Sequence, residues 1–153
     1  MNSIIIIHSL LRYGVVLFGI WTVINAISGL SRKRDYSRSD NLSNLLFMIS
    51  CDIQLLLGLI LYFGGTWFSS LKSDAGSVMG NSMSRFFAVE HISMMLLAWV
   101  LVHIGRVKVK KAETDIARHR KMLIFFGIAF FLIMISIPWP FRTALGKGWL
   151  PVF

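Results

Sequence analysis

Four apolar runs dominate this sequence of 153 residues, and each is long enough to cross a lipid bilayer. A helix rises about 1.5 Å per residue, so roughly 20 apolar residues span a hydrocarbon core of about 30 Å. We therefore predict an all-α integral membrane protein, an up-and-down four-helix bundle forming one domain over residues 1–153. The predicted spans cover about residues 4–30, 42–63, 86–104 and 122–141.

The composition excludes a soluble enzyme and a disordered chain. Hydrophobic residues make up 56% of the chain and charged residues only 15%, whereas soluble domains carry about 25% charged residues. Five Trp and twelve Phe are incompatible with disorder. The first run begins without a basic segment or a small-residue cleavage site, so we expect a retained span and not a signal peptide. Cys51 is the one cysteine and forms no internal disulfide.

The basic residues predict the orientation. Residues 31–41 and 106–121, the first and third connections, hold eleven of the sixteen Lys and Arg. The positive-inside rule places both connections in the cytoplasm and both termini outside. Such basic runs mostly serve topology and attraction to anionic lipid, with a partner-docking site as the alternative. Nucleic acid is not expected as a partner, because the basic residues lie between apolar runs. A Gly/Ser-rich loop over residues 64–84 is expected on the outer side.

Three charged residues lie inside the apolar runs: Arg12, Asp52 and Glu90. An ionisable group at membrane depth costs about 2.5–3.5 kcal/mol, so it usually faces the bundle interior and has a partner. We expect Arg12 to be compensated by Glu90, by Asp52 or by a bound anion. The three residues would then form a buried polar network.

Two histidines, His8 and His91, are expected to face the bundle interior. Small residues follow each of them on its own helix face, and such residues let neighbouring helices approach closely. The small residues are Gly19 and Ala26 after His8, and Ala98 and Gly105 after His91. Both histidines lie near the outer end of their spans, which run in the same direction and should occupy diagonal corners of the bundle.

This arrangement suits the two axial ligands of a haem b. Neighbouring helices pack about 8–10 Å apart, so diagonal helices leave room for two imidazoles with iron between them. Arg12 or Arg85 would neutralise the propionates. The alternative is that each histidine satisfies a neighbouring backbone group or pairs with an acid such as Glu90. His103 lies about 120° around the helix from His91 and does not share its face.

Four segments resemble motifs of short four-helix bacterial membrane proteins labelled cytochrome B-like. The segments are residues 8–13 (HSLLRY), 54–62 (QLLLGLILY), 85–96 (RFFAVEHISMML) and 137–142 (IPWPFR). The resemblance covers nearly the whole chain, and its label implies haem with His8 and His91 as ligands. His103 lies outside these motifs.

Three functions follow as hypotheses. The first is electron transfer by a b-type haem near the periplasmic face, with quinol or a periplasmic carrier as the redox partner. The second is a non-catalytic accessory subunit that packs against a larger respiratory or transport membrane complex. The third is proton or ion passage along Arg12, Glu90 and Asp52. No arrangement of residues favours nucleophilic catalysis, and the question of an enzymatic activity stays open.

Overall fold

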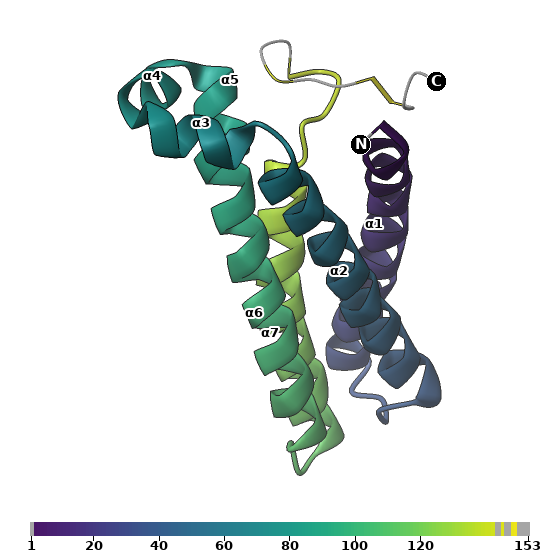
Figure 1. The fold of residues 1–153 in the computed structure, drawn as a ribbon. Helices are drawn as coiled ribbons and strands as arrows, with labels where there is room; N and C mark the ends of the chain where they lie inside the picture. The colour runs from purple at the N-terminus through teal and green to yellow at the C-terminus, as the bar shows by residue number, and fades with distance from the viewer. Residues whose placement is uncertain (1, 143–144, 146–147, 150–153) are drawn as a thin grey trace.

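Four long helices form the body of the protein (Figure 1). The computed structural model describes residues 2–142, 145, 148 and 149; the remainder of the predicted domain lies outside the described residues. The long helices are α1 (Asn2–Ser31), α2 (Arg38–Gly64), α6 (His91–Lys110) and α7 (Asp115–Ser136). A π-helical turn, η1 (Phe86–Glu90), leads directly into α6. The described residues are helical without strands, as predicted, and they include four helices long and apolar enough to cross a membrane.

Three short helices replace the expected loop between the second and third spans. They are α3 (Trp67–Ser73), α4 (Ala75–Gly80) and α5 (Ser82–Arg85). Polar side chains start two of them: Asp74 accepts a hydrogen bond from the Ser77 amide and Asn81 accepts one from the Ser84 amide, each at 2.9 Å. Such caps satisfy amides that have no partner within the helix.

The two ends of the bundle differ in character (Figure 1). The start of α1, the short helices α3–α5 and the end of α7 lie together at one end, which we call the cap end. The connections of residues 32–37 and 111–114 lie at the other, which we call the basic end. The four long helices therefore run alternately up and down.

The packing order around the bundle is α1, α2, α6, α7 and back to α1, which places α1 and α6 at diagonal corners. The predicted small-residue faces of both helices are buried. Gly19 leaves space for the ring of Phe130 on α7, and a Cβ at Gly105 would lie 2.6 Å from the Cβ of Phe125. These glycines let α1 and α6 approach α7 closely, as the sequence pattern predicts.

Two of the long helices have limits that differ from those of the predicted spans. The fourth helix covers Asp115–Ser136 rather than 122–141, because the Thr114 hydroxyl accepts a hydrogen bond from the Ala117 amide and starts the helix early. It ends where Ile137, which precedes Pro138, adopts an extended conformation. The third helix continues to Lys110 rather than 104. Lys108 and Lys110 lie in its last turn, and their long side chains can reach polar surroundings, so the helix can continue past the apolar run.

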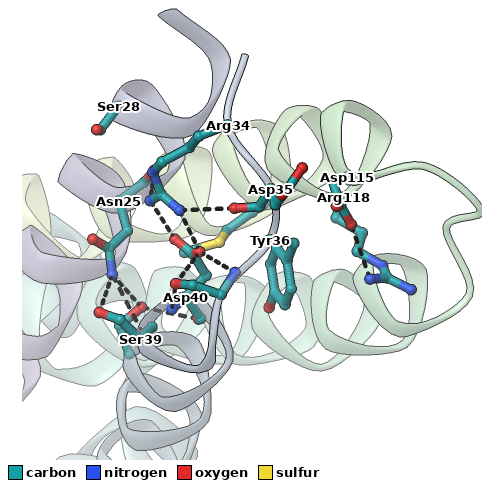
Figure 2. A network of polar contacts seen from close by, with 12 residues as sticks. Asn25, Ser28, Arg34, Asp35, Tyr36, Ser39, Asp40, Asp115 and Arg118 are labelled. Carbon is teal, nitrogen blue, oxygen red and sulfur yellow. Dashed lines mark hydrogen bonds and ion pairs between the residues drawn. The ribbon is translucent and has the colours of Figure 1, made fainter. Parts of the chain in front are cut away.

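A dense polar network ties the helices together at the basic end (Figure 2). Arg34 donates to both carboxylate oxygens of Asp40, at 2.6 and 2.7 Å, and also to the backbone carbonyl of Asn25 on α1, at 3.2 Å. The Asp40 side chain is fully buried and also accepts from the Ser37 amide at 2.7 Å, which completes a capping box at the start of α2. The hydrogen bonds to Asp40 raise the pKa of Arg34.

A second arginine, which is buried, extends this network toward α6. Arg106 donates to the side-chain oxygen of Asn44 and to the backbone carbonyl of Asn41, the latter at 3.3 Å. Asn44 in turn donates to the Tyr36 hydroxyl at 2.7 Å. Arg34 and Arg106 thus have structural roles, whereas the sequence alone predicts that the basic residues mainly set the topology and attract anionic lipid.

Candidate cofactor cavity

A cavity of about 990 Å³ lies among α1, α2, α6 and α7 toward the cap end. This volume is at the upper end of the range typical of small-molecule and cofactor sites, about 300–1,000 Å³. Both His8 and His91 line it, although they come from diagonal helices and are 83 positions apart in the chain. The tertiary structure therefore brings together the two histidines singled out by depth and helix face.

His91 is held in one tautomer. Its Nδ1 lies 2.8 Å from the backbone carbonyl oxygen of Ser136, the last residue of α7. A carbonyl only accepts hydrogen bonds, so Nδ1 carries the proton, and Nε2 of the neutral ring keeps its lone pair. Histidines that bind metals are commonly oriented by such a hydrogen bond from their other nitrogen. The π-helical turn η1 directly precedes His91, and such turns occur frequently at functional sites.

His8 is positioned by α2. Its backbone carbonyl accepts a hydrogen bond from Nε2 of Gln54 at 2.9 Å. Its ring packs against Gly58, where an added Cβ would lie 3.3 Å from Cε1 of the imidazole. Nδ1 of His8 is buried without a hydrogen bond to the described residues. Gly58 therefore leaves the space in which the His8 ring sits, a role that the sequence pattern did not reveal.

Aromatic and apolar side chains supply most of the remaining surface of the cavity. Trp67 stacks on Phe87, with ring centroids 5.2 Å apart and planes inclined by 23°. Tyr62 also lines the cavity and donates to the backbone carbonyl of Ala88 at 2.9 Å, which attaches η1 to α2. The deeper part is lined by Val15, Cys51, Met95 and Ile133. A large planar apolar group would meet complementary surfaces here.

Arg12 lines the same cavity and has unexpected partners. Its Nη2 donates to the backbone carbonyls of Gly148 and Trp149, at 3.2 and 2.9 Å, and to the hydroxyl of Tyr13 at 3.2 Å. Its Nε is buried without a hydrogen bond to the described residues. The guanidinium stays charged at any accessible pH. A positive charge with a spare donor is therefore available at the cavity wall.

Among the described residues, no hydrogen bond or ion pair joins Arg12, Glu90 and Asp52 into the expected buried network. Glu90 instead accepts a hydrogen bond from Nε of Arg85 at 2.8 Å, and both side chains are about two-fifths exposed. Asp52 contacts Trp99 and His103 on the adjacent α6. Glu90 pairs with Arg85 rather than Arg12 because Arg85 precedes it by only five residues, about one turn along the same helical segment. The described contacts do not link these three charges into an ion path.

Arg85, the second arginine expected to neutralise the propionates, has other partners. It is not among the residues that line the cavity, since its guanidinium is held by Glu90 and by the backbone carbonyl of Met79, the latter at 3.0 Å. His103 lies outside the cavity as well, as its position on the helix predicts. The candidate site therefore consists of His8, His91 and Arg12.

The donor set indicates which kind of metal group the cavity suits. Among the described residues, no group of three or more His, Cys, Asp or Glu side chains could hold a metal ion. A bare ion is usually bound by three or four protein ligands. Two histidines suffice, however, for an iron whose other four ligands belong to a porphyrin.

Comparison of the chain with protein-family models, curated proteins and solved structures finds no match. The resemblance to cytochrome B-like membrane proteins therefore stays a prediction that rests on the sequence motifs.

Proposed function

We propose that this protein binds one haem b in the cavity, with His8 and His91 as its two axial ligands. The observation that carries the proposal is that two histidines from diagonal helices line a single large cavity. The hydrogen bond from Nδ1 of His91 to the Ser136 carbonyl supports it further, because this bond leaves Nε2 as the free nitrogen.

The residues present fit such a group. Nε2 of His91 is available as a ligand, and the His8 ring has no competing hydrogen bond at Nδ1 among the described residues. Arg12 would hold a propionate through its unpaired Nε and compensate the negative charge. The stacked pair of Trp67 and Phe87 would pack against the apolar macrocycle. Bound haem supplies a one-electron iron couple in a site largely surrounded by apolar side chains.

Two histidine ligands favour electron transfer over oxygen chemistry, because they leave no open coordination position on the iron. We place the protein in a bacterial inner membrane, in contact with lipid, with the basic end in the cytoplasm. The cavity then lies toward the periplasmic face, and a haem held there would exchange electrons with quinol, a periplasmic carrier or a larger membrane complex.

The visible spectrum of protein purified from haem-replete cells tests the proposal. We expect a low-spin b-type spectrum in the wild type and its loss in both His8→Ala and His91→Ala, because each variant removes one axial ligand. His103→Gln is the matched control, since it removes a histidine outside the cavity and should keep the spectrum. Folded wild-type protein without haem absorbance would reject the proposal and leave the accessory-subunit hypothesis.

A further inference from the structure

A second hollow lies on the outer surface of the bundle, between α2 and α6. It is a groove of about 390 Å³, lined by Asp52, Leu55, Leu56, Leu59, Trp99 and His103. The side chains of Asp52 and His103 are 40% and 37% exposed there. Asp52 lies near the middle of α2 (Arg38–Gly64), so an ionisable pair faces outward at the depth of the apolar core.

Two side chains of α6 approach the same oxygen of Asp52 in this groove. Nε1 of Trp99 donates to Oδ1 of Asp52 at 2.7 Å, and Nε2 of His103 lies 3.4 Å from the same Oδ1. Nδ1 of His103 lies 3.2 Å from the backbone carbonyl of Trp99, which can only accept. Oδ2 of Asp52 has no hydrogen bond to the described residues and is not buried. The groove therefore presents a carboxylate oxygen that is free to accept.

An outward-facing carboxylate at membrane depth is costly unless a donor reaches it, and hydrocarbon tails offer none. The groove has the volume for a small molecule, and it opens on the outer, apolar surface of the bundle, so a donor that dissolves in the lipid could enter it. Trp99 and the leucines add an aromatic and apolar surface beside the free oxygen. A flat aromatic ring that carries hydroxyl groups and an apolar tail supplies such a donor, fits beside Trp99 and the leucines, and dissolves in the lipid.

We propose that this groove binds the head group of a membrane-soluble hydroquinone. One ring hydroxyl would donate to Oδ2 of Asp52, and the ring would pack against Trp99 and the leucine side chains. His103 packs beside the carboxylate, with Nε2 3.4 Å from Oδ1 of Asp52 and Nδ1 near the Trp99 carbonyl, and would limit how the Asp52 side chain can turn. The apolar tail of the ligand would remain in the bilayer.

The place of the groove connects it with the cavity. Leu55 and Trp99 line both of them, so one layer of side chains separates the two. A hydroquinone bound here would lie beside the proposed haem. The inference deepens the proposed function by naming the chemical class of the molecule that would lie beside the haem, and this link rests on that function. Binding of the hydroquinone is tested separately.

Photolabelling tests the site in full-length protein in lipid nanodiscs. The probe is an azido-substituted decyl hydroquinone, kept reduced by excluding oxygen. An excess of unlabelled decyl hydroquinone is the competitor, and peptide mapping is the readout. We expect displaceable labelling on α2 and α6 at the groove. Asp52→Asn should weaken it about tenfold, because it removes the charged acceptor of one hydrogen bond. Glu90→Gln is the matched control, since this acid is 41% exposed but lies outside the groove, and its labelling should be unchanged.

A second variant tests the groove without removing its polar groups. Leu56 is 61% exposed, so Leu56→Trp fills the groove from outside without disturbing the core, and labelling should be lost. Displaceable labelling that maps elsewhere, or that persists at full strength in folded Asp52→Asn and Leu56→Trp, would overturn the site. So would a cross-link showing that a second polypeptide covers the groove in the wild type.

The two proposals fail separately. His91→Ala should lose haem and keep the labelling, whereas His103→Gln should keep haem and lose most of the labelling. Wild-type protein that is labelled at the groove but contains no haem would reject the haem proposal alone. Haem-loaded protein that shows no displaceable labelling at the groove would reject the hydroquinone site alone.

Discussion

Two glycines of α1 have very different surroundings. An added Cβ at Gly14 would meet no atom within 4 Å, whereas at Gly29 it would collide with the ring of His119, which is fully buried. We expect Gly14→Ala to stabilise the protein by about 0.5–1 kcal/mol, because alanine favours the helix. Gly29→Ala should destabilise it by about 1–3 kcal/mol, because a packed core resists extra volume. Unfolding in detergent, followed by circular dichroism, measures both changes, and equal effects would contradict this account.

The ion pair of Arg34 and Asp40 should matter far more than an exposed pair. Asp40 is fully buried, so Asp40→Asn leaves the arginine without its charged partner, and we expect a loss of about 3 kcal/mol in unfolding free energy. Asp115→Asn is the control. Asp115 and Arg118 form an ion pair at 3.0 Å, and both side chains are more than a third exposed. The loss in Asp115→Asn should stay below about 1 kcal/mol. Similar losses in the same unfolding assay would refute the structural role of the Arg34 network.

At the scale of elements, the segment after α7 is attached to α1 through Arg12. The guanidinium donates to the carbonyls of Gly148 and Trp149, and the Tyr13 hydroxyl also donates to the latter. Truncation after Arg142 should therefore leave a buried charge with fewer acceptors. We expect the truncation to cost about 1.5–3 kcal/mol more in wild type than in Arg12→Met, because the variant has no charge to satisfy. Unfolding of the four proteins gives this coupling, and a value near zero would show that the contact contributes nothing.

At the scale of the whole molecule, the charge distribution predicts that the basic end faces the cytoplasm. Cys51 is buried, so single cysteines introduced elsewhere can be labelled against a low background. Ser69→Cys at the cap end and Glu113→Cys at the basic end both replace exposed residues and remove no basic charge. In intact cells stripped of their outer membrane, a membrane-impermeant maleimide should label Ser69→Cys. It should label Glu113→Cys only after lysis, and the reverse pattern would invert the predicted topology.

The helices, their directions and their inward faces could be predicted from the sequence. Apolar runs of about 20 residues and a period near 3.6 are local properties, so they specify length and burial without knowledge of the neighbours. For the same reason, the depth and face of His8 and His91 predicted two residues that line one cavity. Gly19 and Gly105 marked close helix contacts in the same way.

The partners of the polar groups were decided only by the tertiary structure. A guanidinium can reach several acceptors, and small differences in helix rotation and in chain path determine which one it meets. Arg12 therefore bonds to backbone carbonyls more than 130 positions away, while Glu90 pairs with nearby Arg85. The Ser136 carbonyl that orients His91, and the outward-facing pair of Asp52 and His103, likewise depend on how α6 packs against α7 and α2. Periodicity gives the face of each helix, but hydrogen bonds between helices require distances that exist only after the bundle is assembled.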